Sequence, residues 1–245
     1  MRKLYEQKEM LFAVLWIVAY CVIVGTIRGY FGMESIYMLL ALALFTAAII
    51  IFVKANHLED KYGLAGWPKD MNKYLFFIPM WILATGNIWG GFSPSYHGVS
   101  LVIAALSMVL VGFVEEMIFR GFLFRAMLSK NKTTVAIIVS AVTFGIGHIV
   151  NLFIGQTGFE TVIQIIFAIS WGFILTMVCF QSGSIIPCII AHSAIDVLSL
   201  LGADNEIFDW IYIVTTIIVA IVYSIYLGRL KSSDSNKEEL TGTDA

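Results

Sequence analysis

Six ionisable side chains lie inside long apolar stretches of this sequence, where charged groups are rare. They are two adjacent glutamates, an arginine, two histidines and an aspartate: Glu115, Glu116, Arg120, His148, His192 and Asp196. A charged side chain at the middle of a membrane span costs about 2.5–3.5 kcal/mol on insertion scales. Such groups therefore turn into the protein interior or a watered cavity and pair with one another, and they mark candidate functional sites.

The spacing of three of these residues predicts a division of roles on one helix. Glu116 and Arg120 are four residues apart, so they share a helical face and are expected to form a structural ion pair. Glu115 is rotated by about 100° from Glu116. One carboxylate is thus neutralised, and the other stays available for chemistry.

The histidines lie on two further apolar stretches. His192 and Asp196 are also four residues apart, so we expect the carboxylate to accept a hydrogen bond from the imidazole and fix its tautomer. His148 ends the string Phe144-Gly145-Ile146-Gly147-His148, whose glycines allow another helix to come close. Three separate helices therefore each supply acid or base chemistry.

Composition indicates the class of protein that positions these residues. The chain has 245 residues, of which 59% are hydrophobic and 13% charged, whereas soluble domains have about 45–50% and about 25%. A membrane-spanning helix needs ~20 apolar residues to cross a ~30 Å hydrocarbon core. Eight stretches qualify: Leu11–Ile27, Ser35–Val53, Tyr74–Trp89, Val99–Phe124, Val135–Phe153, Thr161–Gln181, Ser184–Leu201 and Phe208–Leu227. We predict an all-α, polytopic bundle of about eight transmembrane helices, forming a single domain over residues 1–227.

The basic residues predict how this bundle is oriented. Cytoplasmic loops are enriched in Lys and Arg, and 13 of the 15 basic residues fall on the side that holds both termini. The opposite side has Arg28 alone, and Arg120 lies within a span. We therefore expect both termini to be cytoplasmic in a multi-pass protein of a plasma membrane, with short loops typical of a bacterium. The polar residues 228–245 are expected to form a disordered tail.

The remaining polar features have simpler interpretations. Cys21, Cys179 and Cys188 are expected to be packing residues, and His57 and His97 to be solvent-facing bystanders. The loop from Lys54 to Lys73 mixes lysines with aromatic and aliphatic residues, which suits a connector lying on the inner membrane surface. The net charge of −2 gives no indication of a nucleic-acid partner. The expected partners are the lipid bilayer and a substrate.

Taken in order, these motifs resemble those of the CPBP intramembrane proteases, which include type II CAAX prenyl endopeptidases and proteins of bacteriocin processing and immunity. The resemblance rests on Glu115-Glu116-Met117-Ile118-Phe119-Arg120, Phe144 with His148, and His192 with Asp196, and it covers about residues 99–201. It implies an intramembrane endopeptidase acting on a membrane-associated peptide or protein. By this resemblance Glu115 and His148 would activate a water, His192 and Asp196 would stabilise the oxyanion, and Glu116 and Arg120 would support the site.

The residues do not decide whether the site binds a metal ion. Glu115, His148, His192 and Asp196 carry the oxygen and nitrogen donors that a catalytic Zn²⁺ accepts, so the family's metalloprotease label could apply. The same four residues can also run a metal-free glutamate mechanism, and the chain has no His-Glu-x-x-His helix.

Two other classes of function compete with a peptidase. Buried Glu, His and Asp also make proton relays in transporters, and the family fold could serve as a non-enzymatic scaffold or immunity factor. A prenylated CAAX tail, a bacteriocin leader and a signalling pro-peptide are not distinguished by the motifs. Each of these substrates is expected to need a cavity that opens toward the cytoplasmic leaflet.

Overall fold

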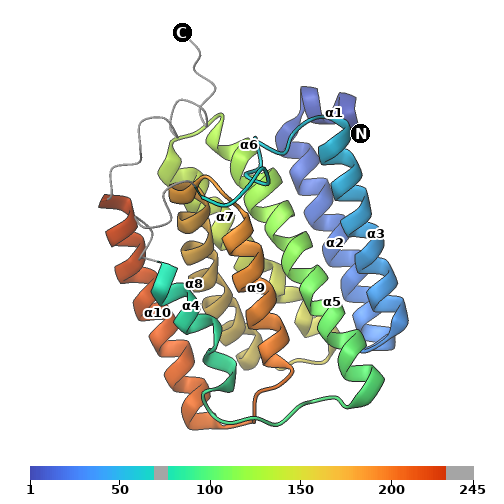
Figure 1. Ribbon diagram of the computed structural model, residues 1–245, viewed down its shortest axis with the longest axis vertical. Coiled ribbons are helices and arrows are strands. Elements are labelled where there is room, and N and C mark those ends of the chain that lie inside the picture. Colours follow the sequence, from blue (N-terminus) through green and yellow to red (C-terminus); the bar gives the residue numbers. More distant parts are fainter. Residues whose placement is uncertain (69–76, 230–245) are drawn as a thin grey trace.

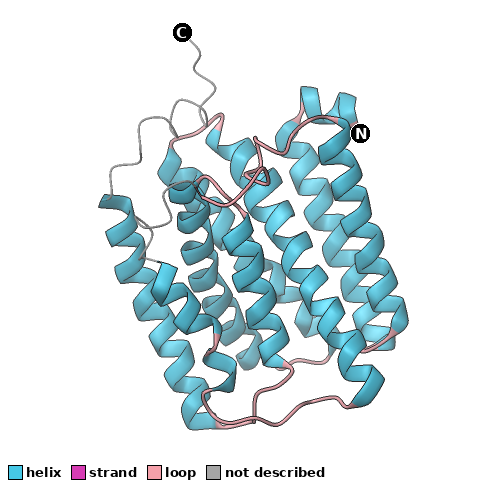
Figure 2. Cartoon of the chain, in the orientation of Figure 1, coloured by secondary structure: helices cyan, strands magenta, loops and turns pink. Residues whose placement is uncertain are grey.

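The computed structural model describes residues 1–68 and 77–229 and is built from helices (Figures 1 and 2). An isolated β-bridge between Phe92 and Gly202 joins two loops. The helices, as the structure has them, are α1 (Arg2–Gln7), α2 (Glu9–Phe31), α3 (Ile36–Ala55), α4 (Phe77–Ala84), η2 (Gly86–Ile88), α5 (Gly98–Glu116), η3 (Met117–Phe124), α6 (Arg125–Leu128), α7 (Thr133–Gly147), η4 (His148–Ile154), α8 (Gly158–Ser182), α9 (Ile186–Ser199) and α10 (Glu206–Arg229). The predicted all-α class is confirmed.

Within residues 1–68 and 77–229, six continuous helical segments are long and apolar enough to cross a membrane, and two apolar segments are shorter. The long ones are Glu9–Phe31, Ile36–Ala55, Gly98–Leu128, Thr133–Ile154, Gly158–Ser182 and Glu206–Arg229, and the shorter ones are Phe77–Ile88 and Ile186–Ser199. All eight fall on the apolar stretches predicted from the sequence. Several apolar helices of membrane length indicate a multi-pass membrane protein.

The helix α9 is too short to cross a full bilayer core. Its 14 residues extend over about 21 Å at 1.5 Å per residue, less than a full bilayer core of ~30 Å. It packs mainly against α5, and Gly112 of α5 allows the backbones to approach, since a Cβ there would lie 2.7 Å from the amide nitrogen of Ser193.

Glycines also bring α7 and α8 together. A Cβ on Gly145 would lie 2.9 Å from the carbonyl oxygen of Ile165, and one on Gly172 would lie 2.9 Å from the Cα of Ala141. The close approach predicted for the glycines before His148 is therefore confirmed for Gly145. This contact holds the helix that ends at His148 firmly against α8.

The sequence predicted that the loop after α3 lies on the membrane surface. The structure instead packs part of this loop into the bundle. Its Tyr62 is fully buried, and the carbonyl oxygen of Gly63 accepts hydrogen bonds from the amide of Ile185 at 3.0 Å and from Ser184 Oγ at 3.3 Å. Lys61 donates to Glu9 at 2.6 Å and to Tyr5 at 2.7 Å. This part of the loop therefore caps the bundle, held by the buried Tyr62 and by hydrogen bonds to the start of α9 and to the amino-terminal helices. The predicted remainder of the loop includes residues 69–76, outside the described residues.

The two ends of the bundle differ in what they contain. The amino-terminal residues and the end of α10 lie together at one end, the upper end in Figure 1. The loops after α2, after η4 and after α9 lie at the other end. The predicted disordered tail falls almost wholly on residues 230–245, outside the described part of the chain, although α10 continues to Arg229. His57 and His97 are exposed, as expected.

The glycine contact between α7 and α8 gives a test of the packing. Gly172→Ala should lower the midpoint of thermal unfolding in detergent, because overpacking against the Ala141 backbone costs about 1–3 kcal/mol. Gly158→Ala, in the same helix, meets nothing within 4 Å and should leave the midpoint unchanged or higher. Equal midpoints for both variants would contradict the close contact.

Candidate active site

The two glutamates lie where the α5 helix changes its winding. Glu115 and Glu116 are the last residues of α5, and Met117–Phe124 continue as a π-helix in which every side chain is buried. A π-helical turn is uncommon and occurs frequently at functional sites. The sequence predicted a plain α-helix here, since no residue pattern signals the wider turn.

The predicted ion pair between Glu116 and Arg120 is present. Arg120 Nη1 donates to Glu116 Oε1 at 2.8 Å, and both side chains are fully buried. The guanidinium also donates to Thr176 Oγ1 at 3.3 Å and to the carbonyl oxygen of Gly172 at 3.4 Å. It lies over the ring of Phe144, 4.3 Å from the centroid. These contacts with α7 and α8 satisfy a cation that would otherwise be very costly to bury.

The same glutamate oxygen holds His192. The Nδ1 atom of His192 lies 2.8 Å from Glu116 Oε1. The same oxygen accepts a hydrogen bond from the guanidinium of Arg120, which can only donate. A carboxylate paired with this cation is ionised and can only accept, so we infer that Nδ1 is the donor of its hydrogen bond. Glu116 is therefore more than a partner for Arg120, since it fixes the ring orientation of His192.

This arrangement corrects the predicted role of Asp196 as the group that fixes the His192 tautomer. Asp196 Oδ2 lies 3.6 Å from His192 Nε2, beyond hydrogen-bonding distance, on the side of the ring opposite to Glu116. Glu115 Oε2 approaches the same Nε2 atom at 3.7 Å. The Nε2 atom thus faces two carboxylates across gaps that a water or a substrate atom could bridge.

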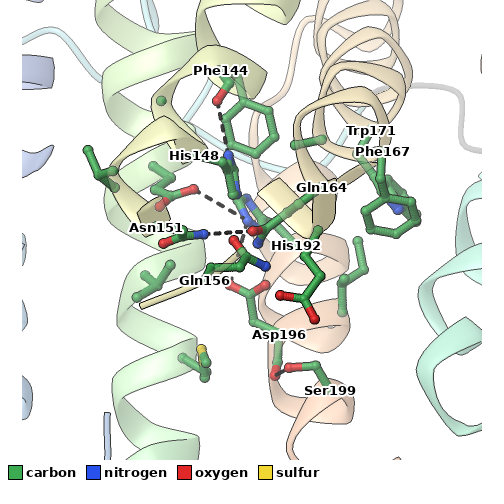
Figure 3. A pocket seen from close by; sticks show the side chains of 18 of the residues that line it. Phe144, His148, Asn151, Gln156, Gln164, Phe167, Trp171, His192, Asp196 and Ser199 are labelled. Carbon is green, nitrogen blue, oxygen red and sulfur yellow. Dashed lines mark hydrogen bonds and ion pairs between the residues drawn. The ribbon is translucent and has the colours of Figure 1, made fainter. Parts of the chain in front are cut away.

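The second histidine is held in a defined tautomer by the backbone. His148 begins the 3₁₀-helix η4, directly after α7, and its Nδ1 lies 3.3 Å from the carbonyl oxygen of Phe144 (Figure 3). A carbonyl oxygen can only accept, so Nδ1 carries the hydrogen, and a neutral ring then has its lone pair on Nε2. The Phe144 ring stands edge-on to both imidazoles, with centroid distances of 5.5 Å.

Sequence reasoning missed a fifth residue of this site. Tyr20, on α2, donates its hydroxyl hydrogen to Glu115 Oε1 at 2.7 Å, and only 6% of the tyrosine is exposed. Glu115 has no ion pair with Arg120, as predicted, but its carboxylate is held by this phenol. A lone tyrosine in an apolar span carries no charge and no spacing signal, so no pattern could identify it.

A cavity of about 800 Å³ brings these groups together. Its walls include the residues predicted to be catalytic together with the tyrosine that the sequence did not reveal: Tyr20, Glu115, His148, His192 and Asp196. Glu116 and Arg120 do not belong to the described lining and lie behind His192. A polar chain continues along the wall, where Arg28 donates to Asn151 at 3.4 Å and Asn151 donates to Gln164 at 2.7 Å.

The structure gives these residues no metal-binding arrangement. Their donor atoms suit Zn²⁺, but within residues 1–68 and 77–229 no group of three or more His, Cys, Asp or Glu is arranged to hold a metal ion. The cysteines are free thiols, buried at Cys179 and Cys188 and half-buried at Cys21. We therefore derive no chemical step through a metal.

Comparison with known proteins places the site within a family. Residues 97–198 match the family model described as Rce1-like, type II CAAX prenyl endopeptidase Rce1-like. The matched region contains Glu115, His148, His192 and Asp196, but it begins well after Tyr20 in the sequence. Comparisons with the curated proteins and with the solved structures gave no match. Residues 97–198 of the chain therefore match an Rce1-like type II CAAX prenyl endopeptidase domain, a domain of the CPBP family.

Proposed function

We propose that this protein is an intramembrane endopeptidase that hydrolyses a peptide bond by means of a side-chain-activated water. The observation that carries the proposal is the single cavity in which Glu115, His148 and His192 meet from three helices. Each of them is oriented by a hydrogen bond at its far side: Tyr20 holds Glu115, Phe144 holds His148 and Glu116 holds His192. Such pre-orientation is what acid–base catalysis needs.

The attacking water would lie between Glu115 and His148. Glu115 Oε2 and the lone pair of His148 Nε2 are both hydrogen-bond acceptors, so together they can orient the water and remove its proton as oxygen attacks the carbonyl carbon. The proton is then returned to the amine nitrogen as the carbon–nitrogen bond breaks. The products are a new carboxyl end and a new amino end.

His192 would stabilise the oxyanion that forms during attack. With Nδ1 donating to Glu116, a second proton on Nε2 makes the ring a cation whose free N–H points into the cavity. That cation would be paired with carboxylates on both sides, at 2.8 Å to Glu116, 3.7 Å to Glu115 and 3.6 Å to Asp196. A preorganised donor aimed at the developing charge is usually a large contribution to catalysis.

We also propose that the protein spans a plasma membrane eight times with both termini inside. The six long and two shorter apolar helices and the distribution of basic residues support this topology. Cysteines replacing Ser95 and Ser235 should report it with a membrane-impermeant thiol reagent on intact cells. We expect labelling at position 95 and none at position 235 until the cells are opened, and the reverse pattern would contradict the topology.

The peptidase proposal is tested by Glu115→Gln. This variant should reach the membrane in normal amounts but lose cleavage by about 10²–10⁴-fold, because the amide keeps the shape and removes the base. Cleavage can be measured by mass spectrometry of cell-envelope peptides from cells with each variant. By contrast, Arg120→Ala should also lower protein abundance, since it leaves Glu116 buried without its cation at a cost of about 3–5 kcal/mol. Full cleavage by Glu115→Gln protein would refute the assignment and favour a scaffold or a carrier.

Asp196 provides a test that separates an electrostatic role from a metal ligand. An ionised carboxylate cannot donate to an oxyanion, and Asp196 makes no hydrogen bond to His192. The amide of an asparagine has the N–H donor that an oxyanion needs, as a protonated carboxyl group would, whereas alanine has none. We therefore expect Asp196→Asn to retain substantial cleavage and Asp196→Ala to lose about 10²–10³-fold. The rates should be measured in liposomes with and without a chelator, with Asp60→Asn, at the capped end of the bundle, as the control. An inactive Asn variant rescued by added Zn²⁺ would make Asp196 a metal ligand instead.

A further inference from the structure

We propose that the cavity receives its substrate from the outer face of the membrane, as a peptide segment exposed on that side. The proposal rests on the proposed function for what happens to the peptide. The end of the bundle at which the cavity opens rests on geometry, and the assignment of that end to the outer face rests on the proposed topology with both termini inside. It also departs from the expectation that the cavity opens toward the cytoplasmic leaflet.

The cavity runs from the catalytic residues toward one end of the bundle. Along α9 the cavity wall passes from buried His192 to half-buried Asp196 and exposed Ser199 (Figure 3). The other exposed charged or aromatic residues of the lining lie at the end of α2, the start of α8 and the start of α10: Arg28, Phe159, Glu160, Glu206, Asp209 and Trp210. These helix ends all lie opposite to the amino terminus and to the end of α10 (Figure 1). The cavity mouth is therefore at that end.

The described part of the other end is packed. Behind His192, the Glu116–Arg120 pair and the whole π-helix are buried. Beyond them, aromatic rings form a continuous cluster in which Phe122 lies 5.1 Å from Phe12, 6.1 Å from Phe52 and 5.3 Å from Tyr62, centroid to centroid. None of these rings belongs to the cavity wall. The aromatic cluster separates the site from the capped end.

The rim of the mouth carries charged residues beside its aromatic ones, which indicates that it meets water and not only lipid. Arg28, Glu160, Glu206 and Asp209 are exposed charged residues on its rim, and charged groups at the membrane depend on water or on partners. Arg28 continues inward through its hydrogen bond with Asn151, which in turn donates to Gln164. Such a wall offers donors and acceptors to a peptide backbone entering from an aqueous phase.

The basic residues assign this mouth to the outer face. Of the 11 Lys and Arg residues that the structure describes, Arg28 alone lies at the mouth end, Arg120 is buried, and nine lie at the opposite end. The side rich in Lys and Arg stays in the cytoplasm. The substrate is therefore a polypeptide segment that has been inserted or translocated so that its cleavage site reaches the outer leaflet.

Cysteine accessibility tests the opening without requiring any cleavage. In a Cys21→Ala background, Cys179 and Cys188 remain buried, so single reporters can be added as Ser199→Cys at the mouth and Lys130→Cys at the opposite end. Intact cells and inside-out vesicles are treated with a sulfonated, membrane-impermeant maleimide. We expect position 199 to be labelled in intact cells and position 130 only in inside-out vesicles. Glu115→Gln protein should show the same pattern, which separates this test from that of peptidase activity.

Other labelling patterns would overturn the proposal. Labelling of both positions from the cytoplasmic side would show that the mouth is not at the end opposite to the termini. Labelling of position 199 only in inside-out vesicles would place the mouth in the cytoplasm, and no labelling from either side would show that water does not reach it. Cleavage by the labelled protein gives a second measurement. The maleimide on position 199 should reduce the cleavage rate at least about 10-fold, which corresponds to about 1.4 kcal/mol. The same adduct on position 130 should leave the rate unchanged. Unchanged cleavage with position 199 fully modified would exclude this route for the substrate.

Discussion

One buried carboxylate oxygen, Oε1 of Glu116, connects the fold to the chemistry. It accepts a hydrogen bond from Arg120 and another from His192, each at 2.8 Å, and the glutamate has no exposed surface. A buried charge is tolerated only when it is paired and hydrogen-bonded. Removal of either donor would therefore disturb both the stability of the bundle and the orientation of the imidazole that faces the cavity.

The close packing of α7 against α8 also serves the ion pair that this carboxylate forms. Arg120 can reach Glu116 while also donating to the carbonyl oxygen of Gly172, and Gly172 has no side chain because the backbone of Ala141 lies against it. The residue that lets α7 and α8 approach thus also supplies an acceptor to the buried guanidinium. The Phe144 ring completes the enclosure, with the cation on one side and the two imidazoles at its edges.

The sequence predicted what the membrane makes costly, and missed what depends on three-dimensional packing. Apolar helices and the ionisable residues inside them were identifiable because lipid tolerates few exceptions. The partner of His192 was not, since a four-residue spacing suggests Asp196 whereas Glu116 reaches it from another helix. Tyr20 and the end at which the cavity opens were missed for the same reason, because contacts between helices distant in the sequence produce no pattern in local spacing. Tyr62 was missed for the same reason.

The separation of a packed half of the bundle from a half that holds the open cavity also bears on how the site would work. Glu116, Arg120 and the aromatic cluster fill the space behind His192, so its Nδ1 contact with Glu116 is buried. The front of the ring faces Glu115 and Asp196 across the cavity, where bound peptide would displace water. Electrostatic interactions strengthen as water leaves. Binding from the open end would therefore increase the effect of the His192 N–H on the developing oxyanion at the moment when that charge forms.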